Sequence, residues 1–111
     1  MFSHKDVLPS GRILVFMITL GKTFFYLSVS TFIIASKTYT LYKKLGEIEQ
    51  ELTAPCFLRC HQSFLVNMNY VKAVDKDFTL TNDDVVLIRK KNLKELRQIY
   101  FDYRKQIHNR Y

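Results

Sequence analysis

A mostly apolar stretch of 23 residues, from position 13 to position 35, constrains the fold of this chain more than any other feature. Its length is that of a membrane-spanning helix. Gly21 and Lys22 lie at its middle, however, and five serine and threonine residues are spread along it. A lysine at the centre of a bilayer is costly, and the many β-branched and aromatic side chains favour strands. We therefore expect two buried strands joined at residues 20–22 rather than a membrane helix.

The residues before this stretch are not typical of a secretory signal. Asp6 and Pro9 follow Lys5, and no small-residue cleavage site closes a short apolar core. We expect residues 1–12 to form an N-terminal lead-in and residues 13–111 to form a single domain. A cytoplasmic location is expected from the same observations.

Further along the chain, short apolar runs rich in β-forming residues alternate with turn residues. Leu45, Ile48 and Leu52 instead recur at helical spacing, and Asn92 followed by Glu95 resembles a capping box at a helix start. These patterns predict helices over residues 45–53 and from residue 92 to about residue 107. The expected strands cover residues 13–20, 23–29, 32–36, 39–42, 57–59, 63–67, 70–74, 78–81 and 85–88.

The order of these elements indicates the fold class. Strands do not alternate regularly with helices, as they do in parallel-sheet folds. We therefore expect a mostly β fold of antiparallel strands, with one short internal helix and a C-terminal helix.

Positive charge is concentrated near the C-terminus. The 111 residues carry a formal net charge of +7, and residues 87–111 hold eight Lys or Arg against Glu95 and Asp102. Such a cluster suits a polyanion or the acidic face of a protein, although a basic helix is often only a solvated surface.

No motif in the sequence makes a convincing catalytic or metal site. Cys60 and His61 are neighbours, but adjacent residues of a strand point to opposite faces. Residues 83–84, two aspartates, are more typical of a turn than of a catalytic pair. In extended chain, Cys56 and Cys60 would lie about 13 Å apart, too far for a disulfide. We expect reduced thiols and no enzymatic activity, metal, cofactor or small-molecule substrate.

Two segments combine positive charge with hydrogen-bonding side chains. Residues 59–63 (Arg-Cys-His-Gln-Ser) lie between two expected strands, and residues 89–92 (Arg-Lys-Lys-Asn) lie between a strand and the last helix. Arg and Lys can contact guanine, Gln and Asn can pair with adenine, and Ser can hold a phosphate. An anion bound there would also be favoured by the helix N-terminus. Residue types alone leave nucleic-acid binding and an ordinary polar surface equally open.

A family resemblance favours nucleic acid. Residues 57–67, FLRCHQSFLVN, resemble the signature of the LytTR DNA-binding domain, in which Arg, a variable residue, His, a polar residue and Ser lead into an aromatic-apolar-Val-Asn strand. The apolar positions of residues 70–74, the strand, basic loop and helix start of residues 86–96, and the helix at residues 45–52 are similar to the family as well. Residues 24–29 match an early strand of the family more loosely.

This resemblance implies an elongated set of small antiparallel sheets without a recognition helix. Its loops would enter successive major grooves, and copies of the domain would bind direct repeats of double-stranded DNA, as in a response-regulator output domain or a stand-alone transcription regulator. The family's base contacts correspond to Gln62 and Lys91, and an early loop near Ser30 and Thr31 would add another. The expected DNA-binding residues are Thr31, Arg59, His61, Gln62, Ser63, Arg89, Lys90, Lys91 and Asn92.

An alternative function belongs to a different class. The same fold could serve as a protein-interaction module that antagonises another regulator, with a regulatory protein or a membrane protein as partner. Binding to duplex DNA that weakens as salt rises would distinguish DNA binding from this alternative, because neutralising phosphates releases counterions.

Overall fold

The computed structural model describes residues 13–18, 30–34, 37–41 and 43–110. Two 3-10 turns, Met68–Tyr70 and Lys90–Asn92, precede the strand Val71–Val74 and the helix Leu93–Arg110 respectively. The elements in chain order are β1 (Ile13–Ile18), β2 (Ser30–Ile34), β3 (Lys37–Leu41), α1 (Leu45–Glu51), β4 (Phe57–His61), β5 (Phe64–Asn67), β6 (Val71–Val74), β7 (Asp77–Leu80), β8 (Val85–Leu87) and α2 (Leu93–Arg110).

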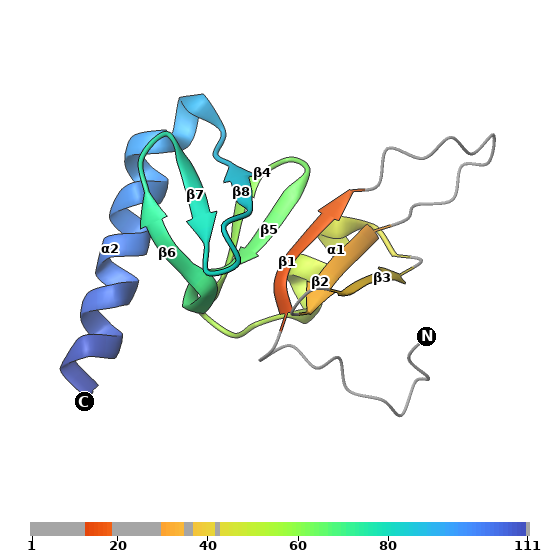
Figure 1. The fold of residues 1–111 in the computed structure, drawn as a ribbon, viewed down its shortest axis with the longest axis horizontal. Helices are drawn as coiled ribbons and strands as arrows, with labels where there is room; N and C mark the ends of the chain where they lie inside the picture. Colours follow the sequence, from red (N-terminus) through yellow and green to blue (C-terminus); the bar gives the residue numbers. More distant parts are fainter. Residues whose placement is uncertain (1–12, 19–29, 35–36, 42, 111) are drawn as a thin grey trace.

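The described strands form two antiparallel sheets. One has five strands in the order β3-β2-β1-β5-β4, and the other has three in the order β6-β7-β8. The second sheet and α2 lie together at one end of the molecule, and β1, β2, β3 and α1 lie at the other (Figure 1). The molecule extends 43 × 32 × 25 Å. The expected mostly β, antiparallel and elongated fold with a short internal helix and a C-terminal helix is confirmed.

The apolar stretch of residues 13–35 forms strands wherever the structure describes it. β1 and β2 pair antiparallel, with Phe16 opposite Phe32. Both rings are fully buried, and their centroids lie 5.5 Å apart. The partner of β1 is thus Ser30–Ile34, whereas the sequence had suggested residues 23–29. That expected strand and the expected turn at residues 20–22 lie outside the described residues.

None of the helices that the structure describes is both long and apolar enough to cross a membrane.

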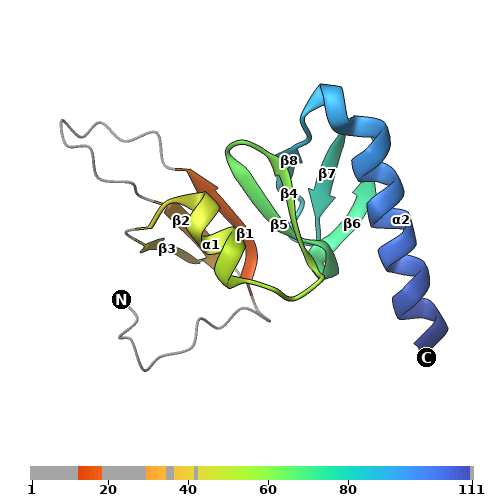
Figure 2. The ribbon, with the colours of Figure 1, turned by 180° about the vertical axis from the view of Figure 1, so that it is seen from behind.

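A smaller hydrophobic core lies between α1 and one face of the five-stranded sheet. α1 covers this face (Figure 2) and buries Leu45 and Ile48 against it. β1 contributes Ile13 and Phe16, which share this core although they are three positions apart. The pairing of β1 with β2 is irregular between Ile13 and Val15, and a bulge there brings both side chains to the same face.

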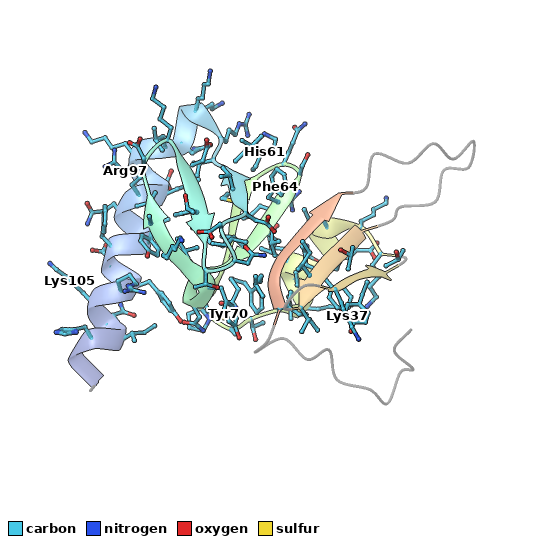
Figure 3. The ribbon with its side chains drawn as sticks, viewed as in Figure 1. Lys37, His61, Phe64, Tyr70, Arg97 and Lys105 are labelled. Carbon is cyan, nitrogen blue, oxygen red and sulfur yellow. The ribbon has the colours of Figure 1, made fainter. Side chains whose placement is uncertain are left out.

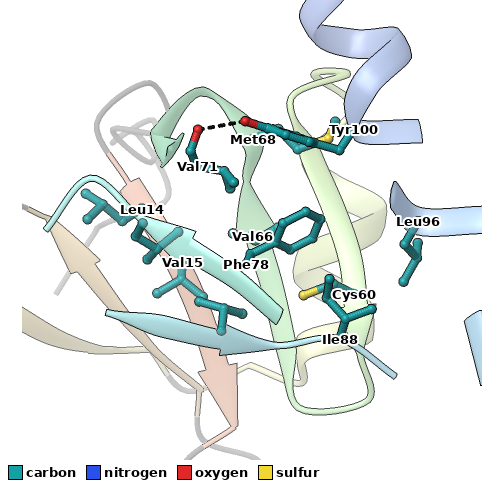
Figure 4. Packing of buried hydrophobic residues seen from close by; sticks show 12 residues of the cluster. Leu14, Val15, Cys60, Val66, Met68, Val71, Phe78, Ile88, Leu96 and Tyr100 are labelled. Atoms are coloured by element: carbon teal, nitrogen blue, oxygen red, sulfur yellow. Dashed lines mark hydrogen bonds between the residues drawn. The ribbon is translucent and has the colours of Figure 1, made fainter. Parts of the chain in front are cut away.

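The larger core lies on the other face of the five-stranded sheet. It joins that sheet to β6–β8 and α2, and Leu14, Val66, Phe78 and Tyr100 are buried in it (Figure 4). The Tyr100 hydroxyl donates a hydrogen bond to the Val71 carbonyl at 3.0 Å, so the polar end of this buried ring is satisfied. α2 is thereby fixed against β6 and β7, and its start is held beside β4.

Asn67 ends β5 and is a fully buried polar residue. Its side-chain amide donates to the Ile13 carbonyl at 2.9 Å, and its side-chain oxygen accepts from the Asn69 N–H at 3.0 Å. Both ends of the amide are therefore used in a place where an unpaired polar group would be costly. The last Asn of the family-like signature has a structural task in this chain.

Candidate nucleic-acid interface

The structure brings the two basic segments of the sequence together at one end of the molecule. The Arg89 N–H donates to the Cys60 carbonyl at 2.8 Å, which ties the chain before α2 to the edge strand β4. His61 and Arg97 lie toward the same end, whereas Lys105 lies further down α2 (Figure 3). A shallow cleft between the segments is lined by Arg59, Cys60, His61, Gln62, Arg89, Asn92, Glu95 and Leu96.

His61 shapes the turn between β4 and β5. Its Nδ1 accepts a hydrogen bond from the Ser63 N–H at 3.1 Å, and its ring lies 5.6 Å from the ring of Phe64. In the neutral ring, Nε2 then carries the proton and can donate to an acceptor outside the turn. Gln62 lies between His61 and Ser63 and is exposed. The turn therefore presents the Gln62 amide at its tip.

Arg59 has partners inside the protein. Its Nε donates to the His61 carbonyl at 3.0 Å, and one Nη donates to the Gln62 carbonyl at 2.6 Å. The other Nη donates to Glu49 of α1 at 2.9 Å. The sequence predicts a direct DNA contact for Arg59, and in the structure its guanidinium is directed toward the backbone of the turn.

Residues 89–92 form a different local structure from the one expected. The sequence suggested a loop that ends at a helix cap, Asn92, but Lys90–Asn92 is a 3-10 turn that continues directly into α2. The Asn92 N–H donates to the Arg89 carbonyl at 2.9 Å, and the Leu93 N–H donates to the Lys90 carbonyl. Backbone carbonyls thus satisfy donors that a capping side chain would otherwise serve.

The four residues of this segment point to two sides of the turn. Arg89 and Asn92 line the cleft that contains Gln62. Lys90 and Lys91 line a neighbouring depression on α2, together with Lys94 and Arg97 among others. The candidate set from the sequence omitted Lys94 and Arg97. The signal that could have found them is the run of cations at helical spacing.

Thr31 is not in a loop. Its backbone lies in β2, opposite Met17 of β1 on one side and Thr40 of β3 on the other. Ser30 begins the same strand, so these two residues themselves lie in a strand. The reason is that Phe32 is buried against β1, which draws the residues before it into the pairing. Residues 19–29 lie outside the described part of the chain.

Cys60 and His61 do not form a catalytic pair. The Cys60 side chain is 1% exposed and belongs to the larger core, where its Sγ lies 3.9 Å from the Phe64 carbonyl oxygen. Burial raises the pKa of the Cys60 thiol to about 12, and His61 faces the turn instead. Cys56 is also a buried free thiol, and burial raises its pKa too. Among the described residues, no group of three or more His, Cys, Asp or Glu is placed to hold a metal ion.

Comparison with known proteins decides the family. The model of the LytTr DNA-binding domain matches residues 11–101. The chain belongs to the LytTR family. It is therefore a DNA-binding domain of the kind found in regulators, and the resemblance inferred from its signature is confirmed.

A solved structure supports the same fold. The LytTR chain is similar to a LytTr DNA-binding domain from Bacillus cereus, with a TM-score of 0.69 and 22% sequence identity. The similarity covers 83% of this chain and 84% of the other. No curated protein sequence matches this chain. At this identity the likeness shows a shared fold, and the residues that contact DNA have to be argued from this chain itself.

Proposed function

We propose that this LytTR domain acts in a cytoplasmic transcription regulator and reads duplex DNA with the end of the molecule formed by the β4–β5 turn and residues 89–92. The observation that carries the proposal is the hydrogen bond between the Arg89 N–H and the Cys60 carbonyl. This bond holds an exposed Gln62 beside a cluster of cations. Separated by 26 positions in sequence, the two segments become one surface.

The residue types on this surface have distinct tasks in DNA recognition. The Gln62 amide has a donor and an acceptor on one planar group, which allows a two-point contact with an adenine edge in the major groove. Lys91 is the second proposed base contact, by its correspondence with the family's loop contact. Arg89 and Lys90 flank these residues and, with Lys94 and Arg97, would hold phosphates on either side of the groove.

Replacing Gln62 tests the base contact directly. Gln62→Ala removes no charge, so binding to scrambled duplex should change by only a few tenths of a kcal/mol. Loss of a two-point base contact should weaken binding to the best operator by about 1–3 kcal/mol. Selection of bound duplexes from a random pool supplies the operator, and fluorescence titrations measure both affinities. Equal losses on the operator and on scrambled DNA would refute the assignment.

Replacing single lysines by glutamine, which removes one positive charge each, separates phosphate contacts from base contacts within residues 89–91. Lys90→Gln should weaken all sequences alike and reduce the slope of log K against log salt by about one unit. Lys91→Gln should weaken mainly the operator, by about 1–3 kcal/mol, and relax the choice at one base pair. If Lys91→Gln weakens every duplex equally, Lys91 is a phosphate contact instead.

Lys105→Gln is the matched control for these variants. It removes the same charge, but Lys105 lies 14 positions beyond Lys91, which is about 20 Å along a helix. The net charge of the protein falls equally in each variant. An effect of Lys105→Gln as large as that of Lys90→Gln would show that net charge, rather than this surface, governs binding.

We further propose that two copies bind in tandem on direct repeats, as the family resemblance implies. A duplex with two sites in the same orientation should bind two copies more tightly than a duplex with the sites inverted. Titration of both duplexes at equal spacing tests this, and indifference to orientation would contradict it.

A second candidate function has one observation in its favour. Phe101 on α2 is 47% exposed and borders both the depression lined by Lys94 and Arg97 and a second one lined by Arg104 and Lys105. An exposed aromatic ring among cations suits an acidic protein partner better than a phosphate backbone. If the wild-type protein shows no salt-dependent binding to any duplex, this protein-interaction function becomes the better account.

A further inference from the structure

We propose that Arg59 is a positioning residue that fixes the β4–β5 turn for recognition by Gln62, and that Glu49 of α1 holds Arg59 in place. This inference rests on the proposed function, because it assigns the specificity of the DNA surface to a contact that does not touch DNA. It replaces the direct DNA contact expected for Arg59 from the sequence.

Three donors of the Arg59 guanidinium are already used within the protein. They reach the carbonyls of His61 and Gln62 and the carboxylate of Glu49, at 3.0, 2.6 and 2.9 Å. The Arg59 side chain is 27% exposed and that of Glu49 is 45% exposed. A phosphate would have to displace one of these partners to gain Arg59, whereas the nearby Lys90 is exposed and needs no such displacement.

The path of β4 places Arg59 where it can bond both the turn and α1. Phe57 packs on the core beneath α1, and Arg59, two residues later in the strand, lies on the same face as Phe57. It therefore reaches Glu49 on α1. The pairing of β4 with β5 is irregular between Arg59 and His61, as in a bulge. The carbonyls of His61 and Gln62 accept the guanidinium donors just beyond this irregular pairing.

These hydrogen bonds control the backbone at Gln62. Gln62 lies at the tip of the turn, and its own carbonyl is one of the groups that Arg59 holds. The Ser63 N–H, which belongs to the same peptide group as the Gln62 carbonyl, donates to His61 Nδ1. The peptide group before Gln62 is held as well, because Arg59 Nε donates to the His61 carbonyl. The backbone of Gln62 is thus fixed from both directions. A side chain that must make two hydrogen bonds to one base edge needs its backbone fixed in this way.

Arginine is suited to this task and lysine is not. The guanidinium is a planar group with five donors in a fixed arrangement, so it can serve two carbonyls and a carboxylate at once. An ammonium group is a compact charge that could still contact a phosphate. Arg59→Lys should therefore keep the charge and lose the positioning.

Titrations on operator and scrambled duplex at several salt concentrations test the proposal. Arg59→Lys should lower the ratio of operator to scrambled affinity about tenfold, which is the loss expected for one well-placed base contact, and leave the salt slope unchanged. Glu49→Ala should lower the same ratio in the same direction but less. Glu47→Ala, at another exposed glutamate of α1, is the matched control for lost negative charge and should leave the ratio unchanged.

Stronger DNA binding by the Glu49→Ala protein would overturn the proposal. If Arg59 contacts DNA directly, removing Glu49 frees its guanidinium, so Glu49→Ala should strengthen binding more than Glu47→Ala does. That result would make Arg59 a phosphate contact. An Arg59→Lys protein that keeps the wild-type ratio of operator to scrambled affinity would likewise refute the positioning role.

A measurement without DNA separates failure of this inference from failure of the proposed function. In NMR spectra of Arg59→Lys, the backbone amides of residues 61–63 should shift, and exchange of the Ser63 amide should accelerate, while the amides of β6–β8 stay unchanged. Unchanged amides in the turn would refute the positioning role, whatever the DNA result. If the amides shift but the wild-type protein binds no duplex, the turn is held as described and it is the DNA-reading function that fails.

Discussion

Replacement of Asn67 by alanine should destabilise the domain strongly, because its side chain joins three elements from a fully buried position. The amide donates to the Ile13 carbonyl at the start of β1 and accepts from the Asn69 N–H in the turn after β5. Asn67→Ala leaves both groups without that partner. Ile13 itself is fully buried, so water cannot replace the lost donor there.

The magnitude follows from where the two abandoned groups lie. A buried polar group left unsatisfied costs about 1–3 kcal/mol. The Ile13 carbonyl should approach the upper value, whereas Asn69 is exposed and its N–H can recover a bond to water. We therefore expect Asn67→Ala to lower the free energy of unfolding by about 2–4 kcal/mol, once the small cavity is included. This is a large fraction of the stability of a typical small domain.

Urea unfolding followed by circular dichroism measures the loss of unfolding free energy. Two further variants test whether that loss comes from the hydrogen bonds. Tyr100→Phe removes a single buried hydrogen bond, to the Val71 carbonyl, and keeps the ring, so it should cost about 1 kcal/mol. Asn67→Leu refills the volume without restoring either bond, and it should be nearly as destabilising as Asn67→Ala. If Asn67→Ala costs no more than Tyr100→Phe, or if Asn67→Leu restores stability, the argument from hydrogen bonds is refuted.

Three other outcomes are expected. Phe78→Ala should cost about 3–5 kcal/mol of unfolding free energy, since its ring is fully buried against Tyr100; a smaller loss in the same urea assay would mean that the core collapses around the cavity. Asp83, at φ 73°, should tolerate glycine, whereas Asp83→Ala should cost about 1 kcal/mol; equal stability of the two variants would contradict this. Cys56, 8% exposed, should react with iodoacetamide faster than Cys60, whose pKa is raised to about 12 by burial; peptide mass spectrometry compares the rates, and faster labelling of Cys60 in the folded protein would refute the assignment.

The sequence determined the elements and the family of this LytTR chain. The strands between Phe57 and Leu87 coincide with the runs of β-forming residues, and the breaks between them come at the predicted turns. This succeeds because hydrophobic period and turn chemistry are local properties, which a chain carries wherever it is placed. The signature in residues 57–67 also indicated the family, since it depends on residue types at fixed spacing.

The tertiary structure decided which strands pair and what the polar residues do. Ser30–Ile34, rather than residues 23–29, pairs with β1, and this pairing buries Phe32 against Phe16. The hydrophobic period of a segment predicts a strand but does not predict which other strand it pairs with. Likewise, whether an arginine side chain is solvated or donates to a backbone carbonyl depends on segments that are distant in the sequence. Arg59 points into the turn because Glu49, ten positions earlier, lies beside it only after α1 has packed on the sheet. Charge and hydrogen-bonding capacity can be read from one residue, but the partners that use them are set by the packing of the whole chain.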